Sequence, residues 1–316
     1  MTRDPASVAI AVLTYRRPAE IAAGLPLVIA QGEQLERLEG AIVNVVVIDN
    51  DAEGSARQTV EAIAAASAFV TVRYVIEPVP GIAAARNRAI DETADADVLV
   101  FIDDDEQPTD GWLAPLIDTW QRTGAAAVMG RVVSDFDGAL DDWVAAGEFF
   151  RRRSMATGTE IAVAAAGNLL LDRLQLQRLG VRFDERLGLA AGEDSLFSRE
   201  LVRRGGRIAW CEESVAIDRV PSDRMTRRWV LDRARSHGNS ETVVKLFLAD
   251  TPAERARVRV AAATRGSVRV LGGSARYGFG VLTGSLRHQA RGLRTAHRGL
   301  GIAAGAAGVV VREYAR

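Results

Sequence analysis

The feature that most constrains the fold is an apolar run that stops abruptly at four acidic residues. Residues 98–102 are five hydrophobic, mostly β-favouring residues, and Asp103, Asp104, Asp105 and Glu106 follow them directly. Such a run predicts a strand buried on both faces. Four adjacent carboxylates repel one another unless they share a cation, and their hard oxygens suit Mg²⁺ or Mn²⁺. A solvated acidic turn is the alternative, but neighbouring runs end in a similar way, which favours a metal site.

Earlier parts of the chain repeat this pattern. Three apolar runs also end in polar residues: residues 7–13 at Thr14, 42–48 at Asp49 and 70–76 at Glu77. Strands that alternate with helical stretches predict βαβ units and a parallel sheet. Ligands of such sheets bind beyond the carboxyl ends of the strands. We therefore expect these polar residues and Asp103 to form one polar cleft.

The sequence also predicts helices and further strands elsewhere in the first 235 residues. Pro18 suits the first turn of a helix that would bury Ile21, Leu25 and Ile29. An Ala-rich helix is expected to follow Gly81. Downstream, the pattern predicts a strand at 125–133, a helix from Asp172 to Leu179 that stops at Gly180, and short strands at 207–210 and 215–217.

Charge is distributed unevenly along the 316 residues. Residues 251–316 hold twelve Arg and two Glu, a net of +10, so the remainder carries 28 basic and 39 acidic residues, a net of −11. We expect a catalytic domain at 1–235, with a nucleotide-binding half (1–110) and an acceptor half (111–235), followed by a basic helical region at 236–316. The single Cys211 excludes an internal disulfide and fits a reducing, cytoplasmic compartment. The late apolar run at 301–311 is too short to span a bilayer.

Several chemistries lack their motifs. Lys245 is the only lysine, so no Gly-Lys-Ser/Thr phosphate loop is present. The first strand is not followed by Gly-x-Gly-x-x-Gly, and no Gly-x-Ser-x-Gly elbow occurs. The three histidines are scattered and form no zinc set with Cys211. Carboxylate chemistry with a divalent ion remains.

Seven short motifs occur in a characteristic order, at residues 12–18, 47–50, 81–87, 101–105, 167–170, 183–185 and 192–194. Over most of residues 7–235 the chain thereby resembles glycosyltransferase family 2, an inverting group with the GT-A fold. The resemblance implies an α/β fold, a GT-A-type, Rossmann-like and mostly parallel sheet flanked by helices. An Arg-rich helical extension would follow it. The donor would be a nucleoside diphosphate sugar.

The resemblance also implies a donor site. It places the base and ribose over Thr14, Tyr15, Arg16 and Asp49, the diphosphate at Arg86, and ribose hydroxyls or metal waters at Asp103 and Asp104. Mn²⁺ or Mg²⁺ would be held by Asp105 with Asp103 nearby. Asp218 stands where many relatives carry a metal-binding His, and it can ligate through oxygen.

Gly192-Glu193-Asp194 supplies the candidate general base. Asp194 is the first choice, and Glu193 is a supporting contact or the alternate base. Acidic residues are also favoured at a helix start by the helix dipole, which is compatible with catalysis. Asn168 and Trp229 are expected in the acceptor or sugar pocket. Met225 stands where processive relatives have Gln, which favours a single transfer.

Two other functions compete with this one. A sugar nucleotidyltransferase shares a similar sheet but needs a Gly-rich turn with Arg and Lys, and residues 15–18 supply neither Gly nor Lys. The second is a catalytically silent sugar-nucleotide-binding or scaffold protein, which intact Asp103, Asp105 and Asp194 disfavour. Nucleic acid is not an expected partner, because no recognition motif is present and the acidic front would repel phosphate. The expected acceptor is a hydroxyl of a glycan or lipid-linked molecule in cell-envelope or exopolysaccharide biosynthesis.

The basic C-terminal region has two interpretations. An apolar line (Leu286, Ala290, Leu293, His297, Leu300) lies at helical spacing beside a basic line (Arg287, Arg291, Arg294, Arg298). Such a helix suits an anionic membrane surface on the cytoplasmic face. Alternatively, a helical hairpin packs on the catalytic domain or on a second subunit of a homodimer, with its arginines meeting the acidic front half of the chain. The sequence leaves both open.

Overall fold

The computed structural model describes residues 7–187 and 190–311, and the chain divides into two compact units. The first comprises Met1–Val133, Arg152–Gly188 and Phe197–Arg219, and the second comprises Ser134–Arg151, Leu189–Leu196 and Val220–Arg316. The second unit therefore draws on three stretches of chain. It is not limited to the C-terminal region that we expected to begin at residue 236.

Within the described residues, eight strands form one sheet in the order β3-β2-β1-β4-β7-β6-β8-β5. Their bounds are β1 Ser7–Thr14, β2 Ile42–Asp49, β3 Thr71–Ile76, β4 Val98–Asp103, β5 Glu106–Pro108, β6 Ala127–Phe136, β7 Asn168–Asp172 and β8 Ile208–Val220. β1 pairs in parallel with β2 and β4, and β2 with β3, whereas β7 runs antiparallel to β4 and β6. The predicted mostly parallel α/β sheet is confirmed in its N-terminal half.

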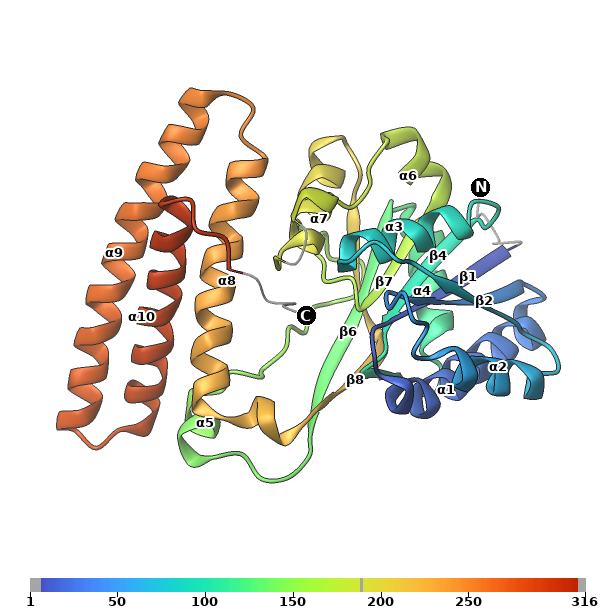
Figure 1. The fold of residues 1–316 in the computed structure, drawn as a ribbon, viewed down its shortest axis with the longest axis horizontal. Helices are drawn as coiled ribbons and strands as arrows, with labels where there is room; N and C mark the ends of the chain where they lie inside the picture. Colours follow the sequence, from blue (N-terminus) through green and yellow to red (C-terminus); the bar gives the residue numbers. More distant parts are fainter. Residues whose placement is uncertain (1–6, 188–189, 312–316) are drawn as a thin grey trace. The chain divides into compact units, whose positions relative to one another are not determined.

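Helices cover both faces of the sheet in the first unit (Figure 1). They are α1 Pro18–Glu39, α2 Arg57–Ala66, α3 Ile82–Glu92, α4 Leu113–Thr123, α6 Arg173–Leu179 and α7 Glu193–Arg203, which begins in the second unit. β1 shows the two-sided burial: Val8, Ile10 and Val12 pack in the core with α1 and α4, and the alternate residues pack with α3, α6 and α7.

The sequence predicted the ends of helices α1 and α6 correctly, but it divided one strand into two. α1 begins at Pro18 and buries its apolar face, and α6 is capped by the Asp172 side chain and ends at left-handed Gly180, so both predictions are confirmed. The two short strands expected at 207–210 and 215–217 are one continuous strand, β8. β4 ends at Asp103, as expected of the acidic run, and Glu106 then begins the additional short strand β5, which pairs antiparallel with β8.

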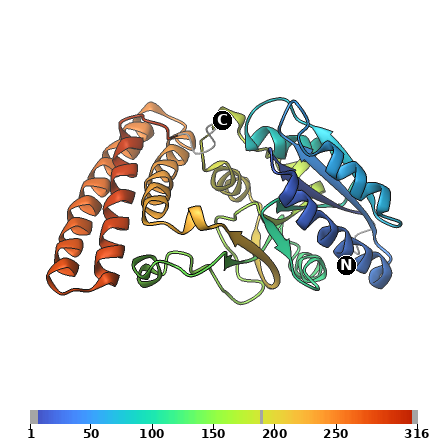
Figure 2. The same cartoon turned by 60° about the horizontal axis from the view of Figure 1, so that its bottom comes forward.

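The second unit contains three long helices side by side (Figures 1 and 2). Its helices are α5 Asp142–Gly147, α8 Arg227–Phe247, α9 Pro252–Leu282 and α10 Leu286–Ala306, with a 3₁₀ turn, η2, at Ser222–Met225. Glycines let the backbones approach closely. A Cβ added at Gly301 of α10 would lie 1.9 Å from the carbonyl oxygen of Arg235 in α8, and one at Gly273 of α9 would lie 2.5 Å from Ala296 N in α10.

The middle of the apolar line of α10 packs inside this unit. Ala290 is fully buried in a cluster with Trp143 and Val230, and Leu293 packs against the same cluster. The two ends of the line, Leu286 and Leu300, are exposed, so only its middle part is covered by α5 and α8.

The basic line of α10 meets carboxylates of the same unit. Arg287 and Arg291 pair with Glu148, and Arg298 pairs with Glu241. α10 therefore packs within its own unit, against α5, α8 and α9, and the expected docking on a membrane or on a second subunit stays a prediction. Among the described residues, no helix is both long and apolar enough to cross a membrane.

Candidate active site

Sheet register aligns the polar strand ends. Thr14 of β1 lies opposite Asp49 of β2, and Leu13 lies opposite Asp103 of β4. The neighbouring residues Asn50 and Asp104 extend the same edge. The register thus brings Thr14, Asp49 and Asp103 to one carboxyl edge of the sheet, and the polar cleft expected there stays a prediction.

Asp104 joins the ends of β1 and β4. Its carboxylate accepts hydrogen bonds from Thr14 Oγ1 and from Arg17 Nη1, each at 2.8 Å, and the same Nη1 lies 3.1 Å from Asp105 Oδ2. Burial, with the nearby Asp105 charge, raises the pKa of Asp104 even though Arg17 opposes this. Loss of water disfavours the Arg17 cation, but the two carboxylates more than offset this and raise the pKa of Arg17. Arg17, which the sequence analysis did not select, is thus the first counter-ion of the acidic run.

Asp49 is fully buried and organises the loop after β2. Its carboxylate accepts hydrogen bonds from Tyr74 Oη at 2.7 Å, from Ala56 N at 2.9 Å and from Asp51 N at 3.0 Å. Burial and this carboxylate raise the pKa of Tyr74. Asp49 therefore fixes the shape of residues 50–56 through contacts inside the chain.

The next residue, Asn50, fixes the turn that leads into α3. Its Nδ2 donates to the carbonyl oxygens of Glu77 and Val79, and its Oδ1 accepts from Gly81 N at 3.0 Å. Gly81 has φ 128°, a conformation that favours glycine. This pairing explains why the Asn50 and Gly81 motifs occur together.

Tyr15 and Arg16 flank the edge from the turn after β1. Arg16 has φ 56°, its guanidinium lies 5.2 Å from the centre of the Tyr15 ring, and its Nε donates to Asp51 Oδ2 at 3.2 Å. Although burial opposes the change, Arg16 and hydrogen bonds from Glu53 N and Ser55 lower the pKa of Asp51. The half-buried Tyr15 ring and the exposed Arg16 guanidinium stand next to the buried scaffold made by Asp49.

Arg86 faces the acidic run from α3. It is 4% exposed, its Nη2 lies 3.9 Å from Asp103 Oδ1, and its guanidinium is 5.3 Å from the centre of the Phe183 ring. The adjacent Asn87 donates to the Phe183 carbonyl and to Glu185 Oε1. Arg86 and Asp103, both expected in the donor site, thus lie close together, and Asn87 holds the segment that supports Arg86.

Glu106 lies in the most unfavourable electrostatic position of this edge. Burial and the charges of Asp103, Asp105 and Asp218 raise its pKa well above the usual range. Its Oε2 is buried and has no hydrogen-bond partner among the described residues. A Cβ added at Gly167 would lie 2.7 Å from Glu106 Oε1 and 2.9 Å from Asp103 Oδ2, so both carboxylates crowd this glycine.

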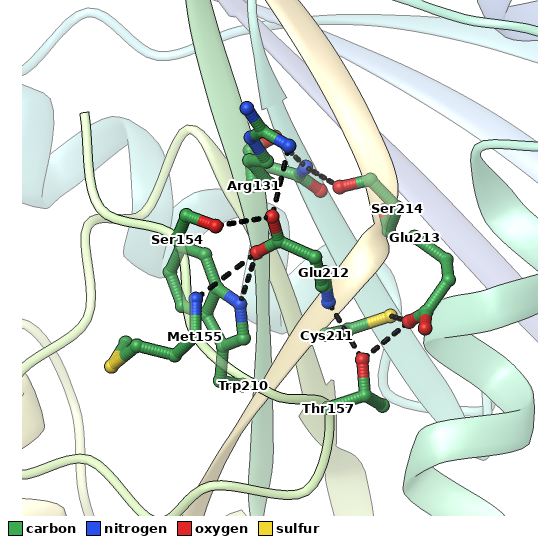
Figure 3. Close-up of polar contacts among 10 residues, drawn as sticks. Arg131, Ser154, Met155, Thr157, Trp210, Cys211, Glu212, Glu213 and Ser214 are labelled. Atoms are coloured by element: carbon green, nitrogen blue, oxygen red, sulfur yellow. Dashed lines mark hydrogen bonds and ion pairs between the residues drawn. The ribbon is translucent and has the colours of Figure 1, made fainter. Parts of the chain in front are cut away.

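A polar network sets Arg152 beside Asp218. The Arg152 guanidinium donates to Asp218, which lies opposite Glu106 in the β5–β8 pairing. Glu212 holds the residues that follow Arg152, because its carboxylate accepts hydrogen bonds from Ser154 Oγ and the Met155 backbone N–H (Figure 3). The same carboxylate also accepts from Trp210 and Arg131. Glu212 is therefore a structural carboxylate that anchors the segment bearing Arg152.

The acidic edge fits a divalent cation by its chemistry. Among the described residues, no three His, Cys, Asp or Glu side chains already surround a common metal position. The buried, unpaired oxygen of Glu106 and the mutual repulsion of the neighbouring carboxylates nevertheless make an oxygen donor set with excess negative charge. A cation here would compete with Arg17, Arg86 and Arg152 for these oxygens.

Glu193 and Asp194 belong to the second unit and begin α7. Glu193 is buried and its Oε2 accepts from Gly192 N at 3.0 Å, whereas Asp194 is half-buried and its Oδ1 accepts from Ser195 N at 2.5 Å. Gly192 has φ 110°, and a Cβ added there would lie 3.0 Å from Val244 Cγ2 of α8. The loop that carries the candidate base therefore rests on α8.

The two residues expected in an acceptor pocket lie in different units. Asn168 is fully buried in the first: its Oδ1 accepts from Trp112 Nε1 at 2.9 Å and its Nδ2 donates to the Arg131 and Ser214 carbonyls. Trp229 lies in the second and stacks on Phe150, with ring centres 5.9 Å apart. Asn168 thus cross-links the sheet, and Trp229 belongs to an aromatic cluster.

Two charged residues of the edge, Arg17 and Arg152, were missed from the sequence, whereas Glu106 was expected only as the fourth member of the acidic run. A signal existed for Arg17, which follows the first strand in the turn that also contains Tyr15. Arg152 had no such signal, because only long-range folding brings it to Asp218.

Comparison with known proteins agrees with this geometry. The sequence matches the family "Glycosyl transferase family 2" over residues 9–180. It is 35% identical over 240 residues to the succinoglycan biosynthesis protein ExoM of Rhizobium meliloti, which covers 76% of this chain and 75% of that protein.

Solved structures show a similar fold. The mannosyltransferase PcManGT from Pyrobaculum calidifontis, in complex with GDP-Man and Mn²⁺, superposes with a TM-score of 0.61 at 19% identity, over 93% of this chain and 86% of its own. GalNAc-T7 with UDP, GalNAc and Mn²⁺ superposes with a TM-score of 0.55 at 15% identity over 75% of this chain, which spans about half (48%) of that protein. These likenesses establish the GT-A type of sheet. Together, the family match, the relative and the polar sheet edge show that the chain belongs to glycosyltransferase family 2.

Proposed function

We propose that this protein is an inverting, metal-dependent glycosyltransferase that moves a sugar from a nucleoside diphosphate sugar to an acceptor hydroxyl in polysaccharide biosynthesis. One observation carries the proposal: at the carboxyl edge of the sheet, a crowded set of carboxylates faces three arginines. A diphosphate and a divalent cation are the two charges that such a mixed site suits. The ExoM relative and the mannosyltransferase bound to GDP-Man support the same donor class.

The donor is expected to lie along the strand ends of the first unit. Tyr15 offers a half-buried ring and Arg16 an exposed guanidinium to the base and ribose, beside Thr14. Asp49 acts by holding the loop after β2 in shape. Arg86 is placed to meet either the diphosphate or Asp103.

Asp105 and Asp103 are the expected metal ligands, and Glu106 and Asp218 complete the oxygen donor set. Asp104 stays bound to Thr14 and Arg17 and orients the edge. Bound Mn²⁺ or Mg²⁺ would supply Lewis-acid stabilisation of the leaving diphosphate. The arginines displaced from the carboxylates would then be available to the phosphate oxygens.

Asp194 is the proposed general base. It takes the proton of the acceptor hydroxyl as that oxygen bonds to the anomeric carbon, while the bond to the diphosphate breaks and its electrons leave with the phosphate. Attack from the side opposite the leaving group inverts the anomeric configuration. The transition state resembles an oxocarbenium ion, as in glycoside hydrolysis. Glu193 supports Asp194, because its carboxylate accepts from Gly192 N and so fixes the start of α7.

A glycan or lipid-linked acceptor, met on the cytoplasmic side of a membrane, fits both the relative's role in succinoglycan biosynthesis and the single cysteine. Trp229, stacked on Phe150 near the start of α8, offers the kind of aromatic face on which a sugar ring stacks. Asn168 contributes indirectly, by fixing β7 against Trp112.

The test is thermal unfolding with uridine or guanosine diphosphate, with and without Mn²⁺. We expect a nucleotide that binds to raise Tm only when Mn²⁺ is present, by mass action. Asp105→Ala should remove this Mn²⁺-dependent rise. Asp118→Ala, on an exposed i,i+4 pair of α4, is the matched control and should keep it. Sugar transfer that is undiminished in excess EDTA would contradict the metal-dependent mechanism.

A further inference from the structure

The outward face of α9 carries no charge over most of its length. From Val260 to Leu282, every exposed residue of this helix is uncharged, whereas Arg265, Arg269 and Arg276 of the same segment are half-buried. A helix at the surface of a soluble protein normally places its charged residues on the face that meets water. The charge pattern of α9 is the reverse of this.

Large apolar side chains occupy that face. The exposed set is Val260, Val268, Leu271, Phe279, Val281 and Leu282, with exposed fractions of 68, 63, 72, 53, 53 and 88%. All but Val281 recur at alternating spacings of eight and three residues, which places them on one side of the helix. A contiguous exposed apolar surface of this kind marks an interaction site.

The inward face of α9 is built from small residues. Gly266, Gly273 and Gly280 recur every seven residues, and a Cβ added at any of them would come within 3 Å of α10 backbone. The bundle therefore closes on glycine contacts and leaves the bulky apolar side chains pointing away from it. Small residues inside and large apolar residues outside are the arrangement of helices whose outer surroundings are apolar.

The charge of α9 and α10 indicates which kind of partner this apolar surface binds. α9 and α10 with their connection, residues 252–306, hold ten arginines and one glutamate, a net of +9. Arg255, Arg257 and Arg259 are exposed near the start of α9, and Arg287 is exposed beyond its end. A second copy of the chain, docked through the same face, would bring two strongly positive helices together. An anionic lipid surface accepts both the apolar face and the positive charge.

We propose that the outward face of α9 docks in the headgroup layer of an anionic bilayer, with the helix lying along the surface. The apolar side chains would enter the acyl boundary, and the arginines at the two ends would meet lipid phosphates. The proposal moves the membrane contact from the line on α10, whose middle packs inward, to α9. It goes beyond the transfer reaction and does not depend on the donor or on the metal.

Flotation of the purified full-length protein with vesicles tests this. The vesicles are pure phosphatidylcholine, or equal parts of phosphatidylcholine and phosphatidylglycerol. Leu271→Asp is the test variant, because the side chain is 72% exposed and contributes nothing to the core. Leu38→Asp in α1 of the first unit is its matched control, because Leu38 has the same 72% exposure.

We expect wild type and Leu38→Asp to float with the anionic vesicles and to be released by high salt. Leu271→Asp should partition at least about tenfold less, because it loses a buried leucine and adds a negative charge. All three proteins should keep the same Tm and the same turnover of a soluble acceptor.

Two results would overturn the proposal. One is flotation of Leu271→Asp at the wild-type level. The other is failure of the wild type to float with the anionic vesicles. If, in that second case, sedimentation velocity shows a dimer that Leu271→Asp dissociates, the occupant of the face is a second copy of the chain.

Discussion

Two carboxylates, one in each unit, show how differently the two regions treat buried charge. Glu241 in α8 is surrounded by Lys245 at 3.1 Å, Arg265 at 2.8 Å and Arg298 at 3.1 Å. Burial opposes ionisation of Glu241, but these cations lower its pKa to about 2. Glu106, at the strand edge of the first unit, lies among other carboxylates, and burial with their repulsion raises its pKa well above the usual range.

The difference supports our proposal that Glu106 helps to hold a cation. Glu241 is compensated inside the chain by three cations, so it needs no ligand from outside. Glu106 lies among repelling carboxylates, so a bound cation would relieve an electrostatic cost in the first unit. The excess of negative charge around Glu106, rather than the number of charges, is the observation that supports the proposed metal site.

The largest expected effect concerns the proton transfer that we assign to the second unit. Asp194→Asn should lower kcat by about 10²–10⁴-fold, because a positioned base contributes this much, and leave donor affinity and Tm unchanged. Steady-state kinetics measure kcat, and nucleotide-induced shifts in Tm measure donor affinity. The control is Asp232→Asn, an exposed α8 residue whose pair with Arg228 spans 3.7 Å. If Glu193→Gln abolishes transfer while Asp194→Asn does not, the roles of the two acids are exchanged.

Glu241→Gln should destabilise the protein. Removing the anion leaves three cations close together, and the expected loss is about 1–3 kcal/mol in the free energy of unfolding, after allowance for partial solvent exposure. Urea unfolding near neutral pH measures it. Glu61→Gln, from an exposed pair in α2, should change the same quantity little. Equal stability of the Glu241 and Glu61 variants would show that the bundle does not depend on this network.

In the absence of metal, Glu106→Gln should change the free energy of unfolding in the direction opposite to Glu241→Gln. Its amide removes one of several repelling charges, so in EDTA the free energy of unfolding should stay level or rise by about 1 kcal/mol. The same variant should lose the stabilisation by Mn²⁺ that wild type shows in thermal unfolding. Marked destabilisation in EDTA would mean that Glu106 is a structural carboxylate like Glu241.

The smallest effect is a pH dependence. A carboxylate whose pKa is depressed in the folded state stabilises above its unfolded pKa and loses this as the pH falls through the folded pKa. For Glu241 this window runs from the ordinary 4.5 down to about 2. The difference between wild type and Glu241→Gln in unfolding free energy should therefore be constant near neutral pH and shrink inside that window. A difference that grows on acidification would reverse the assigned sign.

Much of the first unit follows from local sequence. Apolar runs predicted strands β1 to β4, and because parallel strands end at the same edge, they also predicted that Thr14, Asp49 and Asp103 would meet. β8 was predicted in two pieces because Glu212 and Glu213 interrupt its apolar run. Both side chains are bound by neighbours, Glu212 by Ser154 and Glu213 by Thr157. Side-chain contacts distant in sequence thus complete a strand that composition alone divides.

The direction in which a helix face points was harder to predict than the presence of the helix. Helical spacing in α10 was right, but periodicity does not say which neighbour a face meets. The partners that turn the basic line inward, Glu148 and Glu241, are 143 and 57 residues away from Arg291 and Arg298. Arg152 and its partner Asp218 are likewise distant in sequence, 66 residues apart, so the sequence did not reveal this pair. The roles assigned to individual site residues stay predictions.

The close contacts of α8 have a mechanical consequence. On one side, a Cβ added at Gly301 of α10 would lie 1.9 Å from the Arg235 carbonyl oxygen, and on another, one at Gly192 would lie 3.0 Å from Val244 Cγ2 and 3.2 Å from Ser240 Cβ. A helix with close contacts on two sides transmits a displacement of one neighbour to the other. α8 therefore links the bundle mechanically to the loop of Asp194. Gly301→Ala, in a helix with no part in the chemistry, should displace α8 and slow turnover.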